Sequence, residues 1–413
     1  MNLLFLTPQL PYPPHQGTTI RNFNIIKHLA PRHEITLLSF GTPEELQNAA
    51  PLRALCRHIE IAPYPARTIA QRTRDTFFSP LPDMALRLKS DEMHARVAAT
   101  LADKSFDVIQ VEGIEMARFI SPLASRPAPL VFDDHNAEYV LQRTACESDA
   151  RRVSRWHAAL YSFVQWKKLE HYERDVCRRA RHIVACSDTD ANALRELLTP
   201  TLNPNLSIIP NGVDTDFFVP SDAVCAKPLA DLSLVFIGKM DFRPNIDAML
   251  WFCDEILPRI RTELPLAHLV IVGQKPAPRV AALRARPGVA VTGWVADTRP
   301  YVADAAVYVV PLRMGSGTRL KVLEAMAMGK AIVSTARGVE GIDLVADRDA
   351  LIADTPDAFA RAVAALLRDA DRRRVLGRAA RALAESKYDW RKIVPKFEQV
   401  YEMTKDGGRK TKE

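Results

Sequence analysis

Short apolar runs alternate with stretches of helical periodicity along nearly the whole chain. In the first half, the apolar runs have the length and the β-branched content of buried strands. They lie at residues 2–6, 34–40, 58–62, 107–111, 130–133 and 182–186. Most are separated by amphipathic helical patterns, such as those of residues 19–29 and 91–102. Strand and helix patterns that alternate in this way predict βαβ units and a parallel sheet.

The alternation stops in residues 203–230, which are rich in Pro, Asn and Asp, and then begins again. Two separate series of strands predict two doubly wound α/β domains, which we place at residues 1–215 and 216–388. A last amphipathic pattern predicts a terminal helix at residues 389–404, and the polar residues 405–413 are expected to form a disordered tail. The second series of strands is expected at residues 232–238, 268–273, 289–293, 306–310 and 331–334, before a helical run at 358–383.

The composition is that of an ordinary soluble enzyme, with 47% hydrophobic and 25% charged residues among 413. The formal net charge of +7 favours an anionic ligand or membrane surface over a dedicated nucleic-acid partner. The cysteines show no metal-ligand spacing, which is typical of a reducing compartment. Residues 1–6 are too few for a signal peptide, and no apolar run is long enough to span a membrane. We therefore expect a cytoplasmic protein that contacts the inner face of the membrane at most peripherally.

Residues 136–181 interrupt the alternation with a long, helical and basic pattern. Apolar side chains recur there at steps of three and four residues, at Val153, Trp156, Leu160 and Phe163. One interpretation is a helix that lies on anionic lipid, near a lipid-linked acceptor. The other is an amphipathic helix that packs on its own domain and exposes a solvated basic face. Acidic residues interleave the basic ones, which favours the second interpretation.

The most informative segment is residues 309–330, in which a buried strand is followed by a Gly-Ser-Gly loop and by a helix that Thr318 is expected to cap. Arg319 and Lys321 would lie in the first helical turn, where the positive end of the helix dipole disfavours cations. Basic side chains and exposed backbone N–H groups at a helix N-terminus make sense when an anion binds there. The segment therefore predicts an anion site.

Glu324 follows Lys321 by one helical turn, so the two side chains share a helix face. A carboxylate behind an anion site suits hydrogen bonds to sugar hydroxyls, such as those of a nucleotide ribose. The alternative is that the two residues simply pair on a surface helix, but the glycine loop and the cations favour a ligand site. Neither half of the chain has a full G-x-G-x-x-G, since the first offers only Gly17 and the second only Gly238. A nicotinamide dehydrogenase is therefore not favoured.

With these motifs the chain resembles the retaining, GT-B-fold glycosyltransferases of family 4 over nearly its whole length. The supporting segments are residues 209–214, 237–240, 270–273, 292–297 and, most specific, 321–329. Residues 134–138, 240–245 and 315–321 are further similar to sugar transferases of exosortase (PEP-CTERM) exopolysaccharide loci. The resemblance implies two Rossmann-like domains that face each other across a cleft, with the C-terminal helix crossing back to the first domain.

The resemblance assigns most donor-binding roles to the second domain. Glu324 matches the second glutamate of the family's paired-glutamate motif, which implies ribose binding, whereas Ser316 replaces the first glutamate. Backbone amides of the glycine loop would then take over contacts to the donor sugar. The lysine expected on the phosphates falls on Pro244, so Arg243 or a helix cation would supply that charge. The complete set expected to bind the donor is Gly17, Gly238, Arg243, Gly293, Trp294, Val295, Gly315, Ser316, Gly317, Thr318 and Glu324.

The expected catalytic residues are His135, Lys239, Arg319 and Lys321. The three cations would stabilise the charge that grows on the departing nucleoside diphosphate, with Lys239 matching a phosphate-binding arginine of the family. No metal or other cofactor is then expected. His135 matches a histidine that lines the reaction centre and would orient the donor sugar or acceptor, although a lone histidine at a strand end is more often structural. Two Asp-x-Asp runs, at residues 188–190 and 214–216, are better explained by a helix start and a turn.

The resemblance thus implies a glycosyltransferase that moves a sugar from a nucleotide-sugar donor to a glycan or lipid-linked acceptor with retention of configuration. Its place would be exopolysaccharide or cell-surface polysaccharide synthesis. The alternative is a catalytically lapsed nucleotide-sugar-binding or scaffold protein, which the replacement at Ser316 leaves open. The arginines of residues 368–381 predict a solvated helix face and no nucleic-acid partner, because aromatic residues do not interleave them.

Overall fold

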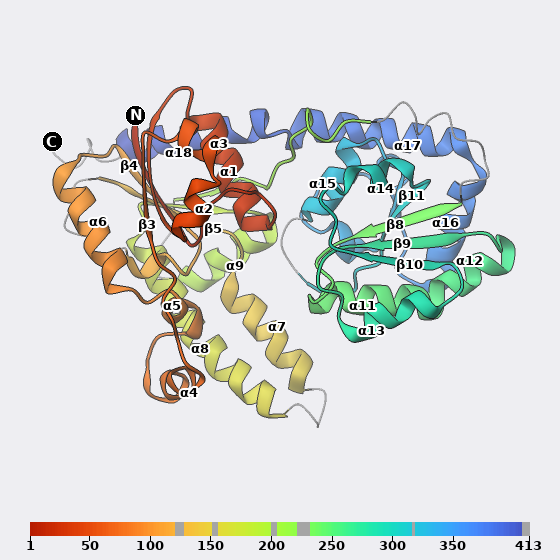
Figure 1. The fold of residues 1–413 in the computed structure, drawn as a ribbon, viewed down its shortest axis with the longest axis horizontal. Coiled ribbons are helices and arrows are strands. Elements are labelled where there is room, and N and C mark those ends of the chain that lie inside the picture. The colour runs from red at the N-terminus through yellow and green to blue at the C-terminus, as the bar shows by residue number, and fades with distance from the viewer. Residues whose placement is uncertain (120–127, 151–155, 200–204, 221–231, 316–318, 407–413) are drawn as a thin grey trace. The chain divides into compact units, whose positions relative to one another are not determined.

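The computed structural model describes residues 1–119, 128–150, 156–199, 205–220, 232–315 and 319–406. The chain forms two compact units, one of Met1–Pro210 together with the chain from Ile393 onward, and one of Asn211–Lys392. Each unit contains a parallel sheet with helices packed on it (Figure 1). The two predicted doubly wound α/β domains are therefore confirmed, and the fold is GT-B.

The first unit is built on a seven-stranded parallel sheet in which β1 (Asn2–Thr7) is flanked by β2 (Glu34–Phe40) and β4 (Val108–Glu112). Leu3 lies opposite Ile35 on one side and Val108 on the other. The outer strands are β3 (His58–Ala62), β5 (Leu130–Asp134), β6 (His182–Ala185) and β7 (Leu206–Ile208), in the order β3-β2-β1-β4-β5-β6-β7. The order reverses between β1 and β4, and ligands of open parallel sheets bind beyond the carboxyl ends of the strands at such a reversal.

The helices of the first unit follow the strands in the alternation that the sequence predicts. α1 (Gly17–Leu29) begins with a Gln16–Thr19 capping box and buries Ile25, Ile26 and Leu29. The terminal helix α18 (Trp390–Asp406) buries aromatic side chains in this unit from Ile393 onward. The others are α2 (Pro43–Gln47), α3 (Ala50–Leu55), α4 (Ile69–Phe78), α5 (Asp83–Arg87), α6 (Asp91–Asp103), α7 (Glu138–Ala150), α8 (Trp156–Arg179) and α9 (Asp188–Leu198).

The second unit has a six-stranded parallel sheet with the same kind of reversal, here between β8 (Ser233–Ile237) and β11 (Val307–Val310). The other strands are β9 (His268–Val272), β10 (Val289–Gly293), β12 (Ile332–Ser334) and β13 (Leu351–Ile352), in the order β10-β9-β8-β11-β12-β13. Its helices are α11 (Arg243–Trp251), α12 (Leu257–Glu263), α13 (Pro278–Ala281), α14 (Arg299–Asp304), α15 (Leu320–Ala327), α16 (Pro356–Arg368) and α17 (Ala370–Leu383). Among the described residues, no helix has both the length and the apolarity needed to cross a membrane.

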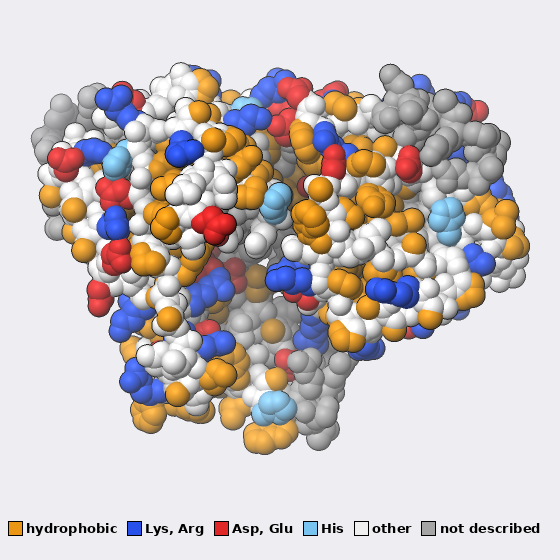
Figure 2. Space-filling view, viewed as in Figure 1, with side chains coloured by type: hydrophobic (Ala, Val, Ile, Leu, Met, Phe, Trp, Pro, Cys, Tyr) orange, Lys and Arg blue, Asp and Glu red, His pale blue; other side chains and the backbone are white. Residues whose placement is uncertain are grey.

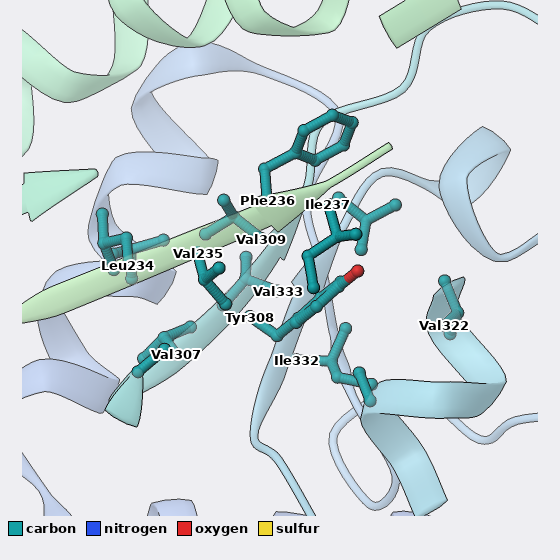
Figure 3. Packing of buried hydrophobic residues seen from close by; sticks show 14 of the residues in the cluster. Leu234, Val235, Phe236, Ile237, Val307, Tyr308, Val309, Val322, Ile332 and Val333 are labelled. Atoms are coloured by element: carbon teal, nitrogen blue, oxygen red, sulfur yellow. The ribbon is translucent and has the colours of Figure 1, made fainter. Parts of the chain in front are cut away.

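The core of the second unit fixes the helix that follows β11. The Tyr308 ring lies between Ile237 and Ile332, and its hydroxyl end points toward the side where α15 contributes Val322 (Figure 3). Val322 and Leu323 are fully buried. Burial of this apolar face sets the rotation of α15 and thereby the positions of its polar side chains.

Several boundaries differ from the expectations for physical reasons. β7 and β13 are edge strands of three and two residues, too short to give a periodic pattern. Residues 358–383 form two helices rather than one, because Asp369 follows α16 and caps α17 by accepting from the Arg372 N–H over 2.8 Å. Lys405, predicted in the tail, belongs to α18, and its Nζ lies 2.6 Å from Asp107 Oδ1. The rest of that tail, from residue 407, lies outside the described residues.

Candidate functional site

At the strand-order reversal of the second sheet, Gly238 lets the half-buried Lys321 approach the end of β8. A Cβ atom at position 238 would lie 2.8 Å from Lys321 Nζ and 2.7 Å from Asn245 Nδ2. Real Cβ contacts are longer than this, so a larger residue would displace both side chains. Gly238 therefore creates the space that Lys321 occupies.

Lys321 reaches from the first turn of α15 to α11. Its Nζ donates to Asn245 Oδ1 over 2.8 Å and lies 4.2 Å from the centroid of the Phe236 ring. The surface pairing of Lys321 with Glu324, considered above, is thus replaced by a hydrogen bond to a neutral amide. Burial lowers the pKa of Lys321 to about 7, with Arg319 lowering it further and Glu324 opposing the shift. An anion bound nearby would restore the full charge of this ammonium group.

Glu324 lies one turn further along α15. Burial raises its pKa to about 7, and Lys321 opposes the shift. The same carboxylate contributes to raising the pKa of the buried Tyr308 phenol, after burial itself. A carboxyl group with this pKa is partly protonated near neutral pH, so Glu324 can both donate and accept hydrogen bonds.

Arg319 does not lie in the first turn of α15 as predicted. The helix begins at Leu320, so Arg319 rather than Thr318 occupies the N-cap position. Its side chain is buried and folds toward Gly315, where two guanidinium nitrogens lie 3.3 Å from the position of a Cβ atom. Burial lowers the pKa of Arg319. Glu340 opposes this shift and Arg337 adds to it, and the net shift is downward. Together, Arg319 and Lys321 place one buried and one half-buried cation at the start of one helix.

The other predicted site residues of this unit differ in exposure, and some of them lie outside the described residues. Lys239 is exposed, with Nζ 3.8 Å from Asp241 Oδ1, and Arg243 is the first residue of α11. Trp294 is 69% exposed after β10, and its neighbour Val295 packs against the core. Gly293 ends β10, and among the described residues nothing lies within 4 Å of where its Cβ would be. The predicted residues Ser316, Gly317 and Thr318 lie outside the described residues.

In the first unit, His135 follows β5 and is held by a residue that the sequence analysis does not single out. Its Nε2 lies 2.9 Å from Oε2 of Glu112, a fully buried glutamate at the end of β4. Both strands lie on the same side of the β1–β4 reversal, and the helix that starts at Gly17 follows β1. The structure thus brings His135 and the first turns of α1 to the carboxyl end of one sheet.

A buried arginine of α1 lies beside this pair. Arg21 contacts both carboxylate oxygens of Asp133, at 2.8 and 2.9 Å, and its terminal nitrogen also donates to Ile209 O over 3.1 Å. Burial lowers the pKa of Arg21, but Asp133 outweighs that effect together with other acidic groups, so the net shift is upward. In the sequence, Glu112 and Arg21 are recognisable only as charged residues within apolar patterns. Their partners, His135 and Asp133, are more than twenty positions away, so the sequence does not indicate the pairing.

Acidic side chains clamp the turn between β5 and α7, just after His135. Glu173 of α8 accepts the N–H groups of Glu138 and Tyr139, each over 2.9 Å, and Asp190 accepts that of Ala137 over 3.1 Å. Burial raises the pKa of Glu173 to about 7 and that of Glu138 to about 8, the latter with help from Glu173. Asp190, from one Asp-x-Asp run, therefore fixes a helix start.

Three of these side chains also have the spacing of metal ligands. One ligand atom each of Glu112, Asp133 and His135 lies within 4.8 Å of the other two. However, Arg21 already contacts both Asp133 oxygens, and the Glu112 carboxylate already contacts His135. A divalent cation would have to displace an arginine cation, so the donor set is a poor fit for a metal ion. In the other Asp-x-Asp run, Asp216 pairs with Arg391 at 3.0 Å.

Both halves of the chain match models of known families. Residues 16–217 match the model described as Glycosyltransferase Family 4, and residues 231–369 match that described as Glycosyl transferases group 1. The phosphatidyl-myo-inositol mannosyltransferase of Mycobacterium tuberculosis is 30% identical over 220 residues, which make up 49% of this chain and 55% of that protein. That of Mycolicibacterium smegmatis is 29% identical over 217 residues, 49% of this chain and 53% of that protein. The matches thus span about half the length of these curated relatives.

Solved structures resemble the whole chain at low sequence identity. Sucrose-phosphate synthase from Thermosynechococcus elongatus has a TM-score of 0.73 at 18% identity, covering 98% of this chain and 99% of that chain. HepE of Anabaena in complex with UDP has a TM-score of 0.68 at 14% identity, covering 98% and 100%. These likenesses concern the fold alone. Together with the family models, they show a GT-B protein built from two glycosyltransferase domains, an N-terminal one that matches Family 4 and a C-terminal one that matches group 1.

Proposed function

We propose that the protein is a metal-independent, retaining glycosyltransferase that moves a sugar from a nucleotide-sugar donor to a glycan or lipid-linked acceptor. The relatives named as mannosyltransferases of phosphatidyl-myo-inositol support a lipid-linked acceptor, and the HepE structure with UDP supports a nucleotide donor. A role in exopolysaccharide or cell-surface polysaccharide synthesis, at loci of the exosortase type, belongs to the same proposal and rests on the sequence resemblance.

One observation supports this function above the others, which is the placement of Lys321 against Gly238. A half-buried ammonium group at the end of β8, beside the buried Arg319, offers positive charge where an open sheet binds ligands. Charge that develops on a leaving diphosphate is stabilised most by donors that are already in place and desolvated. Glu324, one turn behind Lys321, would accept from the ribose hydroxyls.

In this mechanism the chain's own residues bind and orient the reactants. The exposed Lys239 and the half-buried Arg243 would hold the outer phosphate oxygens, and Gly293, Trp294 and Val295 would frame the base. Ser316 stands where the family has the first glutamate of its motif. Backbone N–H groups of residues 315–318 would make the contacts to the donor sugar in place of that glutamate. Gly17 would let the donor phosphates approach α1. His135 would orient the donor sugar or the acceptor hydroxyl rather than attack the sugar itself.

Ligand-dependent unfolding tests the donor site directly. The melting temperature is measured with a panel of nucleoside diphosphates and nucleotide sugars, for the wild type beside Glu324→Ala. A ligand at 100 times its dissociation constant stabilises by about 2.7 kcal/mol. We expect stabilisation by one nucleotide family and its loss in the variant. Glu263→Ala, which removes an exposed glutamate paired with Arg368, is the control and should keep the response. If no nucleotide shifts the melting temperature, the proposal is wrong.

The lapsed-enzyme alternative gives a different pattern in the same experiment. A protein that binds nucleotide sugars without transfer would show the stabilisation and its loss in Glu324→Ala, but no release of nucleoside diphosphate with any acceptor extract. His135→Ala would then change neither binding nor turnover. A transferase would lose turnover in His135→Ala while keeping nucleotide binding.

We further propose that the first unit contacts anionic membrane peripherally, through α4 and the first turns of α8. None of the residues of α4 is buried, and Ile69, Phe77 and Phe78 are 82%, 70% and 84% exposed. Lys168 of α8 donates to the Asp75 and Thr76 carbonyls, which joins the two helices. Orange and blue side chains alternate over the lower end of the first unit in Figure 2, where Figure 1 places α4 and the start of α8.

The charges of these two segments favour an anionic lipid partner over a neutral one. Asp75 is held in an ion pair with Arg67. The side chains of Arg72, Arg74 and Lys167 are 56%, 70% and 52% exposed, although each also pairs with an acidic side chain of the same unit. Exposed aromatic side chains beside cations are typical of helices at membrane interfaces. This observation gives the lipid interpretation of residues 136–181 more weight than their sequence alone.

Co-sedimentation with vesicles tests this contact. We expect binding to vesicles that contain phosphatidylglycerol, weaker binding to phosphatidylcholine alone, and loss of binding in the double variant Phe77→Ser, Phe78→Ser. Leu266→Ser changes a side chain of the second unit that is 78% exposed, and should bind as the wild type does. Equal binding of the double variant would contradict the assignment to α4.

A further inference from the structure

We propose that Glu112 is a positioning residue, which fixes the His135 imidazole so that Nε2 faces the protein and Nδ1 is the nitrogen offered to a ligand. This inference rests on the proposed function for the role of His135, but the geometry of the pair does not. Glu112 itself lies too deep to meet a ligand, since its side chain is fully buried.

The Glu112–His135 pair is a buried contact with a defined partner atom. Glu112 Oε2 lies 2.9 Å from His135 Nε2, and the His135 side chain is 15% exposed. A carboxylate that accepts from one ring nitrogen determines which tautomer is present and how the ring is turned. Here it places the proton of the neutral imidazole on Nε2 and leaves the lone pair on Nδ1.

Glu112 is itself held rigidly, which a positioning residue requires. Gln110 Nε2 donates to Glu112 Oε1 over 2.7 Å. With its amide nitrogen turned toward the carboxylate, Asn22 of α1 donates to Oε2 over 2.8 Å. Tyr401 of α18 in turn donates from its hydroxyl to Gln110 Oε1. Donors from α1 and β4, supported by α18, thus leave the carboxylate little freedom to turn away from His135.

The other edge of the ring faces Gly113. Gly113 has a φ of +80°, and a Cβ atom there would lie 3.7 Å from His135 Nδ1 and 3.0 Å from Glu115 Oε2. Any larger residue would be strained and would also crowd this edge. Gly113 therefore keeps the approach to Nδ1 open, just as Glu112 closes the approach to Nε2.

The other charged groups around the ring are already paired. Asp133 of β5 is neutralised by Arg21 of α1, and Glu115 pairs with Arg87 of α5. Desolvation and Asp133 raise the pKa of Glu112, whereas His135 and Arg21 lower it. Glu112 is thus the group whose charge acts most directly on the His135 proton.

Histidine-selective nitrogen NMR tests the inference without reference to activity. The His135 signals are assigned by their loss in His135→Gln. In the wild type we expect the neutral imidazole to be protonated at Nε2. A neutral form protonated at Nδ1 would overturn the proposal, and this part of the test needs no change at Glu112.

The variant Glu112→Gln then separates positioning from a structural role. It keeps the size of the side chain but removes its charge, so the preference of the neutral His135 imidazole for the proton on Nε2 should weaken in the nitrogen NMR spectrum. The kcat for transfer should fall about 10- to 100-fold, as for carboxylate partners of metal-ligating histidines, while the donor KM stays within about twofold.

Glu60→Gln provides a matched control, since Glu60 Oε1 also lies 2.9 Å from a histidine nitrogen, on the exposed His58. It should leave kcat and the His135 signals unchanged. If Glu112→Gln lowers only the melting temperature, or raises only KM, Glu112 has a structural role and the inference is wrong. If the wild type transfers no sugar from any donor, the proposed function fails, whereas the His135 tautomer and its response to Glu112→Gln still decide the inference.

Discussion

The carboxyl ends of the two sheets have different polar arrangements. In the first unit, the buried charged side chains have polar partners within the protein, with Arg21 on Asp133 and Glu112 on His135. In the second unit, the half-buried Lys321 is hydrogen-bonded to the neutral Asn245. A self-neutral site suits uncharged sugar hydroxyls, while a site with excess positive charge suits a diphosphate. The same sheet topology can therefore present either kind of surface, depending on which charges are compensated within the protein.

The largest effect is expected from breaking the buried Arg21–Asp133 ion pair of the first unit. Arg21→Met leaves Asp133 buried without its partner, which typically costs about 3–5 kcal/mol. Chemical denaturation should show this loss in the free energy of unfolding. Arg32→Met is the control, because Arg32 pairs with Glu398 at an exposed position and should contribute less than about 1 kcal/mol. Equal losses in the two variants would contradict the assignment of a buried ion pair.

The second largest effect concerns the charge of the second unit. Lys321→Met should weaken nucleoside diphosphate binding about 10- to 100-fold, since hydrogen bonds to charged groups contribute about 1.5–3 kcal/mol. Calorimetry measures the dissociation constant. With a pKa of about 7, Lys321 loses its proton as pH rises from 6 to 8, so wild-type binding should weaken across this range. A variant whose binding keeps the same pH dependence would show that another group is responsible.

A smaller effect is expected from Glu138, a buried carboxyl group in the turn that follows His135. The pKa of Glu138 is about 8 in the fold against 4.5 for the unperturbed group, so the folded protein binds more protons than the unfolded chain between these values. Stability should therefore fall as pH rises from about 5 to 8. Glu138→Gln should make the melting temperature less dependent on pH over this range. An unchanged pH dependence would contradict the raised pKa.

The smallest effect is expected at Lys239. This lysine is exposed, so replacing it with Met should weaken donor binding only about two- to fivefold, as for other exposed ion pairs. Competition binding with a nucleoside diphosphate measures the difference. A loss as large as that of Lys321→Met would mean that Lys239 contributes as much to donor binding as Lys321 does.

The parts of the protein that the sequence predicts are those encoded by neighbouring residues. Apart from the short β7 and β13, each described strand coincides with a predicted run to within one residue at either end, because each is a contiguous apolar segment. Lys321 and Glu324 are predicted together because they are one helical turn apart. The hydrogen-bond partner of Lys321 could not be predicted in this way, because Asn245 lies 76 positions away.

Glu112 and Arg21 were missed for the same reason. Glu112 is 23 positions from His135, and Arg21 is 112 positions from Asp133. No periodicity links residues at such distances, and only the sheet order places β4 between β1 and β5. The charge balance of the first unit is thus a property of topology, whereas the positive charge of the second is a property of one motif.

The terminal helix α18 has a consequence for biosynthesis. Its residues from Ile393 onward complete the first unit, although the whole second unit precedes them in the chain. On the ribosome, the strands of the first sheet emerge long before Phe397 and Tyr401, which are fully buried against them in the final fold. Vectorial folding of the N-terminal half therefore stops at an intermediate with exposed apolar surface. Nascent chains should remain dependent on chaperones until α18 has been synthesised, and chains that stop before α18 should be cleared by proteolysis.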